Sequence, residues 1–298
     1  MTQRRAEALL LLITCLWGGT FAIIKDALVT TSPAVFVLLR FGLALVMAIA
    51  IWPRAMRGWN RRLVMRGMAL GSLYGICLLL QSVGLTSISA SSSAFITGSA
   101  IIFVPFIHRG VTGTSIRPRH LVAAVIVVVG LWLLTEASMG GFRIGDIVTL
   151  ISALLWAFYL TYIDVWTSEL RDDPDKQNAL VIMQFGMTVI LAGITELILE
   201  GGAFRFTWNT SIVWSLLYCS VVASVLATWV QTRFQQYTHP VRAGMIFAVE
   251  PLAASAIAFV AFDESWSMAK VVGAIIMLAG MILPDYLASR RTITTTTS

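Results

Sequence analysis

The sequence predicts an all-α membrane protein in which ten transmembrane helices form two inverted five-helix repeats around a central cavity. Three observations lead to this fold class. Of the 298 residues, 58% are hydrophobic and only 12% are charged, whereas a soluble domain carries about 25% charged residues. Apolar runs about as long as one bilayer crossing, roughly 20 residues, follow one another along the chain. The basic residues gather in alternate connections between these runs.

Ten apolar runs are bounded by charge clusters, glycines or prolines. The third and fourth runs are separated only by an uncharged, serine-rich link at 86–93, so a single kinked helix is the alternative there. The whole stretch 63–108 is nevertheless far too long for one crossing. The runs cover residues 8–27, 33–52, 63–85, 90–108, 121–137, 144–166, 178–199, 212–234, 240–262 and 268–287.

The distribution of basic residues predicts the orientation in the membrane. Sixteen of the 21 lysines and arginines lie on the same side as the N-terminus, and Arg40 lies inside the second run. Cytoplasmic loops carry the excess of basic residues, so both termini are expected in the cytoplasm of a bacterium, with the chain spanning the inner membrane. This topology also accounts for the net charge of +6, and no nucleic-acid partner is expected. The opposite side holds Lys25, Arg143, Arg205 and Lys270.

The chain resembles itself at a shift of roughly 140 to 150 residues, which predicts an internal duplication. Residues 1–138 form the first repeat, 139–291 the second, and 292–298 a disordered, threonine-rich tail. Because each repeat has an odd number of spans, the second enters the membrane from the opposite side. Inverted repeats are typical of secondary transporters, whose substrate site lies near the bilayer midplane; a duplication that only builds a stable bundle is the alternative. The matched pairs are Trp17 with Trp156, 40–42 with 184–186, Gln81 with Gln231, and Gly130 with Gly280.

Several motifs resemble those of the EamA-type transporters of the drug/metabolite transporter superfamily, and they cover nearly the whole chain. Such a resemblance implies gradient-driven export of amino acids, other metabolites or toxic organic compounds, and among these proteins the chain is most similar to exporters of aromatic amino acids. One departure is visible, because Ser99 stands where the second half has Glu250. The motifs are LWGGTF at 16–21, IK at 24–25, Pro33, Arg40, GD at 145–146, ALLWA at 153–157, EP at 250–251, GA at 273–274 and AG at 279–280.

Three charged side chains are candidates for binding or coupling. Glu250 lies ten residues into the ninth run, about 15 Å deep at 1.5 Å per residue, near the middle of the bilayer. An ionisable group at this depth is a functional candidate by default: it could carry a coupling proton or bind a substrate amine, and a structural bond to a neighbouring helix is the alternative. Arg40 could pair with Glu250 or attract a carboxylate, or it could snorkel to the headgroups. Lys25 is an interfacial charge or a ligand.

Polar and aromatic side chains are expected to line the cavity. Tyr74 and Gln81 share one face of the third run, where lipid would reject them and a water-filled cavity would not. Aromatic side chains around a few polar groups suit an amphipathic or aromatic solute, although packing or a position at the membrane interface is the alternative for each of them. The expected lining is Trp17, Tyr74, Gln81, Ser99, Trp156, Tyr159, Trp229 and Glu250.

The sequence lacks the usual marks of an enzyme. The three histidines lie near run ends, and the HExxH, GxSxG and P-loop patterns are missing, so no metal and no cofactor are expected. We expect a monomeric secondary transporter with a small-molecule substrate and the lipid bilayer as partners. It should export amino acids, aromatic or otherwise neutral, or amphipathic drug-like compounds. An uptake or exchange carrier and a membrane-embedded enzyme are the alternatives, and a channel would be distinguished by unsaturable flux.

Overall fold

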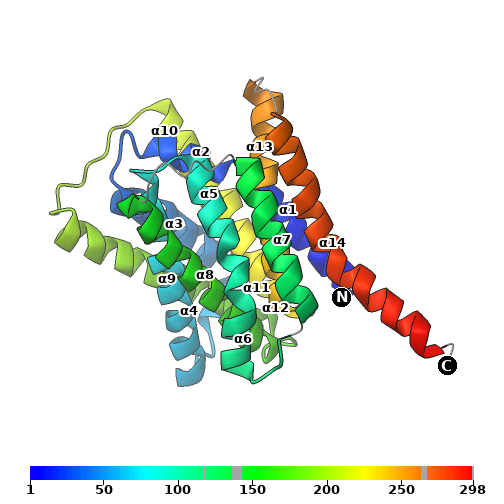
Figure 1. The fold of residues 1–298 in the computed structure, drawn as a ribbon. Coiled ribbons are helices and arrows are strands. Elements are labelled where there is room, and N and C mark those ends of the chain that lie inside the picture. The colour runs from blue at the N-terminus through cyan, green and yellow to red at the C-terminus, as the bar shows by residue number, and fades with distance from the viewer. Residues whose placement is uncertain (117, 136–142, 263–266, 297–298) are drawn as a thin grey trace.

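The protein, described from a computed structural model, is built from helices (Figure 1). The structure describes residues 1–116, 118–135, 143–262 and 267–296, with side chains for all of these except 258–262 and 284–296. Within these residues nine helical segments are long and apolar enough to cross a membrane, and the shorter apolar helix Met268–Leu283 makes a tenth. The predicted ten-helix, all-α fold is confirmed, and the chain is a multi-pass membrane protein.

The first five spans contain two broken helices. The third and fourth spans are separate helices, as predicted, because α4 ends at Leu85 and α5 begins at Ala90. In order, the first half consists of α1 (Gln3–Trp17) with α2 (Thr20–Ala27), α3 (Pro33–Ile51), the short η1 (Pro53–Met56), α4 (Arg61–Leu85), α5 (Ala90–Gly98) with η2 (Ser99–Ile102) and α6 (Val104–Thr112), and α7 (Pro118–Thr135).

The second five spans contain one broken helix and one that is locally widened to a π-helix. α14 runs on to Thr296, past residue 292 where the sequence predicts a disordered tail, and the last two residues lie outside the described chain. In order, the second half consists of α8 (Ile144–Ser168), α9 (Pro174–Leu199), α10 (Thr210–Leu217) with the π-helix η3 (Tyr218–Leu226), α11 (Ala227–Phe234) and η4 (Gln235–Tyr237), α12 (Pro240–Phe247) with α13 (Glu250–Phe262), and α14 (Met268–Thr296).

The break in the first span follows from two glycines. α1 ends at Trp17 and α2 starts at Thr20, so Gly18 and Gly19 form the joint. A Cβ atom on Gly18 would lie 2.8 Å from the main-chain nitrogen of Ala254, closer than packed atoms allow. Only glycine therefore lets the joint of the first span touch α13 of the ninth.

The helices of the two halves interleave rather than forming separate bodies. α4 packs against α8 and α9, and α3 packs against α9 and η3. α7 and α14 lie against each other (Figure 1), and their contact is close because a Cβ on Gly130 would lie 2.5 Å from the main-chain nitrogen of Met277. This interleaving leaves the middle of the bundle lined by both halves.

Candidate functional site

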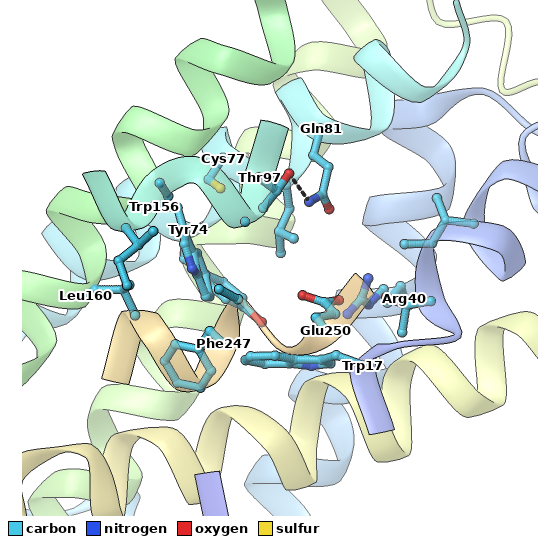
Figure 2. Close-up of a pocket in the computed structure, with 18 residues that line it drawn as sticks. Trp17, Arg40, Tyr74, Cys77, Gln81, Thr97, Trp156, Leu160, Phe247 and Glu250 are labelled. Carbon is cyan, nitrogen blue, oxygen red and sulfur yellow. Dashed lines mark hydrogen bonds between the residues drawn. The ribbon is translucent and has the colours of Figure 1, made fainter. Parts of the chain in front are cut away.

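A cavity lies at the centre of the bundle, between the broken first, fourth and ninth spans (Figure 2). Its walls come from α1, α2, α3, α4 and the fourth span of the first half, and from α8, α12 and α13 of the second. Its volume is about 60 Å³, which holds a few water molecules but is well below the roughly 300–1,000 Å³ of pockets for drug-sized ligands. A solute of amino-acid size would require these walls to move apart.

Glu250 and Arg40 form the charged end of the cavity. Figure 2 shows the Glu250 carboxyl beside the Arg40 guanidinium, with the Trp17 ring next to them in the lining. Glu250 is the first residue of α13, directly after the break in the ninth span. Among the residues that the structure describes, none forms a hydrogen bond or a salt bridge with its carboxyl group. The side chain is partly exposed, so it can meet a solute or a water molecule in the cavity.

Arg40 is held from behind by the π-helix. The side chain is only 4% exposed. Its Nε donates to Ser224 Oγ at 2.8 Å, and its Nη2 donates to the Ala223 carbonyl oxygen at 3.4 Å. The guanidinium also lies 5.0 Å from the centroid of the Phe41 ring. Arg40 therefore does not snorkel out of the bundle but faces inward, at the cavity.

Aromatic rings line the wall beside the charged end. The Trp17 ring lies 6.0 Å from Trp156 and 5.6 Å from Phe247, centroid to centroid. Tyr74 lies 6.1 Å from Trp156 and exchanges a hydrogen bond of 3.0 Å with Thr228 Oγ1. Rings in tilted and edge-to-face contact support one another, so this wall offers a fixed apolar surface.

Gln81 supplies a polar group on the same face of α4 as Tyr74. Its Nε2 donates to Thr97 Oγ1 of the fourth span at 3.3 Å, and both side chains line the cavity (Figure 2). One helical turn before it, the Cys77 thiol lies 3.1 Å from Ser152 Oγ. The face predicted from the spacing of Tyr74 and Gln81 thus points into the cavity.

The structure brings six of the ten predicted site residues together around the cavity and places four outside its lining. Ser99 Oγ donates to the Ile96 carbonyl at 2.6 Å, so its hydroxyl is used within its own helix. The Lys25 ammonium donates to the Leu85 and Ile88 carbonyls at 2.7 and 2.6 Å and so holds the end of α4. The six that line the cavity are Trp17, Arg40, Tyr74, Gln81, Trp156 and Glu250.

The two remaining predicted residues are aromatic and pack elsewhere. Tyr159 is fully buried behind Tyr74 and Trp156, at 5.2 and 5.0 Å between ring centroids, and its hydroxyl donates to Gln184 Oε1 at 2.8 Å. Trp229 stacks on Trp52 at 6.4 Å. Both follow the packing alternative, because each ring lies outside the lining of the cavity and contacts other aromatic side chains of the bundle.

Sequence reasoning missed the residues that hold Arg40. Ser220 and Ser224 lie in η3, where the helix widens, and neither interrupts the apolar run. Wide turns of this kind occur often at functional sites, but their hydrogen-bond pattern is visible only in three dimensions. Two serines four residues apart within an apolar run are the one signal that the sequence offers.

The sequence profile of the EamA-like transporter family matches residues 4–136 and 143–284. The chain belongs to the EamA-like transporter family. This places it in the drug/metabolite transporter superfamily. A protein of Archaeoglobus fulgidus named an uncharacterized transporter is 24% identical to this EamA-like chain, over 93% of this chain and 85% of the relative.

Two further comparisons agree with this family. A Salmonella typhimurium protein named a probable amino-acid metabolite efflux pump is 24% identical over 94% of this chain and 95% of its own length. One crystal structure resembles this protein with a TM-score of 0.75 and 15% identity, covering 96% of this chain and 98% of the other, and at that identity the likeness concerns the fold alone. The family and these named relatives are transporters rather than enzymes.

Proposed function

We propose that this EamA-like transporter exports neutral amino acids with aromatic or bulky side chains, or amphipathic drug-like compounds of similar shape, across the bacterial inner membrane. The observation that carries the proposal is the Glu250 carboxyl, which faces the cavity beside Arg40 and has no protein partner among the described residues. A zwitterionic solute can offer its ammonium group to Glu250 and its carboxylate to Arg40.

The remaining wall of the cavity suits the other end of such a solute. Rings at Trp17, Trp156 and Phe247 offer an apolar, aromatic surface next to the two charges. Mostly apolar walls with a few placed polar groups are the usual design of a small-molecule site. The relative named an amino-acid metabolite efflux pump supports the same substrate class and the outward direction.

Alternating access is supported by bonds that tie the two halves at both ends of the bundle. At the end that holds the N-terminus, Arg242 Nη2 of α12 donates to Glu7 Oε2 of α1 at 2.9 Å. At the opposite end, Ser211 Oγ donates to Asp26 Oδ2 at 2.7 Å. To open the narrow cavity to one side, the bond at that end must break while the bond at the opposite end remains intact. The positive-inside rule assigns the Glu7–Arg242 end to the cytoplasm.

We further propose that a monomer in the bilayer is the working unit, because a single chain supplies every wall of the cavity. Glu250 is the candidate for the coupling proton, since an ionisable group in the membrane interior is functional by default.

Counterflow in proteoliposomes tests this function. Liposomes loaded with an unlabelled solute should take up the labelled solute in a saturable way for phenylalanine, tryptophan and leucine, and for amphipathic cations of similar size. Linear, unsaturable flux would indicate a channel instead. Turnover of a substrate by detergent-solubilised protein would revive the enzyme alternative. Efflux from preloaded cells then separates export from uptake.

Glu250→Gln tests the role of the carboxyl. Exchange by this variant should lose its dependence on pH, because the amide cannot take up or release a proton. Glu169→Gln is the matched control: Glu169 pairs with Arg62 and Arg66 at the end of the bundle, away from the cavity. A Glu250→Gln protein that transports like the wild type at every pH would make Glu250 structural.

A further inference from the structure

We propose that Ser224 of η3 is a positioning residue that fixes the orientation of the Arg40 guanidinium and thereby sets the preference for solutes with a carboxylate. The inference rests on the proposed function, because it assigns the carboxylate of the exported solute to Arg40. It adds a residue that does not line the cavity itself and acts only through the arginine.

The Ser224 hydroxyl donates one hydrogen bond and accepts another. It donates to the Cys219 carbonyl, five residues earlier, at 2.8 Å, and it accepts from Arg40 Nε at 2.8 Å. The five-residue separation is the spacing of a π-helix turn, so the bond depends on the widened geometry of η3. With donor and acceptor directions both set, the hydroxyl is fixed in space, and it is fully buried.

The neighbouring carbonyl fixes the second contact of the guanidinium. The Ala223 oxygen accepts from Arg40 Nη2 at 3.4 Å and from Trp17 Nε1 at 2.9 Å. A carbonyl oxygen has two lone pairs, so the Ala223 oxygen can accept from Arg40 and from Trp17 at the same time. One wide turn of the eighth span therefore orients both Arg40 and Trp17.

The shape of the guanidinium determines which of its edges remains available to a carboxylate. The group is a rigid, planar fork with five N–H donors, and η3 occupies the edge that carries Nε and Nη2. The end of the fork with the two terminal nitrogens is the other edge able to bind a carboxylate with two parallel bonds. Without Ser224, the fork could rotate about its long side chain, and that edge would lose its fixed direction.

Ser220 provides a matched control within the same π-helix. It is fully buried like Ser224, and its hydroxyl donates to the main-chain carbonyl of Arg40 at 2.9 Å. Ser220 thus holds the backbone of α3, whereas Ser224 holds the charged group. The two serines differ in the part of Arg40 that they bind.

The test compares phenylalanine with phenylalaninamide, which lacks the carboxylate, in the counterflow assay. Ser224→Ala should raise the KM for phenylalanine about tenfold and leave the KM for the amide within twofold of the wild type. Ser220→Ala should change both values by the same factor, since it removes a bond to the backbone of α3 and leaves the contacts of the guanidinium in place. Ser224→Thr, which keeps a hydroxyl, should restore the wild-type ratio. Melting temperatures of all three variants establish that they are folded.

Each outcome decides the inference. If Ser224→Ala shifts both KM values equally, or neither, while the wild type exchanges phenylalanine, Ser224 is structural and only this inference fails. If Ser224→Ala does not fold, the ratio of the KM for phenylalanine to the KM for phenylalaninamide is measured in Ser224→Thr and in Arg40→Lys instead. Equal ratios in the wild type and in Arg40→Lys would overturn the inference. If the wild type exchanges no solute with a carboxylate, the proposed amino-acid substrate and the inference fail together.

Discussion

The fourth and ninth spans occupy corresponding places in the two halves, and both are broken near their middle. The fourth passes from α5 through η2 to α6, with the break around Ser99, and the ninth passes from α12 to α13, with the break just before Glu250. Gly98 and Ala100 line the cavity at the first break, and Ala248 and Glu250 line it at the second. The backbone plan is shared, but the carboxyl group belongs to one half alone.

The difference separates what the backbone break in each span provides from what single side chains provide. Both breaks bring backbone close to the cavity. At the first break, placing Ser99 in the membrane costs little free energy, because its hydroxyl bonds within its own helix. A carboxyl group inside a membrane is costly, so one at the second break needs a compensating charge. Arg40, from the second span of the first half, lines the same end of the cavity (Figure 2). The asymmetric charge thus depends on a residue from the opposite half.

The largest expected effect contrasts the two breaks directly. Glu250→Gln should lower the exchange rate about 100-fold, because the neutral amide would lose the charge-assisted bond to the substrate ammonium, and bonds to charged groups contribute about 1.5–3 kcal/mol. Ser99→Ala should stay within twofold of the wild type, since the Ser99 hydroxyl donates to the Ile96 carbonyl of its own span. Counterflow rates at equal protein content measure both. Comparable losses in the two variants would mean that the breaks contribute equally.

The next effect contrasts the fifth and tenth spans, which carry matching glycines. Gly130→Ala should destabilise the protein by about 1–3 kcal/mol, the usual cost of overpacking, because the new methyl would meet main-chain atoms of α14 at 2.5 and 2.8 Å. Gly280→Ala should cost less, since its nearest neighbours include two side-chain methyl groups, both at 3.0 Å. Denaturant titration in detergent measures the difference. Gly186→Ala, with nothing within 4 Å, is the control.

A smaller effect returns to the glycines beside the two breaks. Gly244→Ala should be neutral or stabilising by up to about 1 kcal/mol, because alanine favours helix and the nearest atom to the new methyl lies at 3.6 Å. Gly98→Ala should gain less or lose stability, because Leu131 Cδ1 would lie at 3.0 Å. Thermal melting ranks the pair. The reverse ranking would show that the fourth span is packed more loosely than the ninth.

The smallest effect concerns how the second and seventh spans begin. The first turn of α3 is bound by Glu200 of the other half, whose Oε1 accepts from the Ala34 main-chain nitrogen at 3.0 Å. α9 is capped by its own Asp173, which accepts from the Lys176 main-chain nitrogen at 3.0 Å. Burial, followed by the neighbouring Glu196, raises the pKa of Glu200. Hydrogen bonds from Lys176 lower the pKa of Asp173.

These opposite pKa shifts predict opposite pH dependence. The stability that Glu200 contributes is complete below its unfolded pKa of about 4.3 and is lost as the pH rises through its raised folded pKa. Glu200→Gln should therefore remove a small fall in melting temperature that begins as the pH rises above about 4.3. Asp173→Asn should remove a small loss on the acidic side, as the pH falls through the lowered pKa. Melting curves from pH 3 to 9 test both, and parallel curves for the wild type and Glu200→Gln would refute the first.

Much of the fold followed from the sequence because membrane spans are specified locally. Each run needs only enough apolar residues for one crossing, and all ten are present as helices. The glycine joint at Gly18 and the π-helix were not predicted, because each depends on a contact with another span. Six of the ten candidate site residues line the cavity, and Lys25 and Ser99 do not, because carbonyl oxygens in their vicinity bind their side chains.

The sequence by itself determined the ten spans, their helical character and the presence of a single acidic residue deep in the second half. Hydrophobic length and the positions of charges are properties of the chain, and the bilayer acts on them directly. Only the tertiary structure decided which polar residues meet. Arg40 and Ser224 are 184 residues apart in the chain, and their bond exists because interleaved packing brings α3 against η3. The orientation of a charge in a cavity is a property of such contacts, which no local pattern encodes.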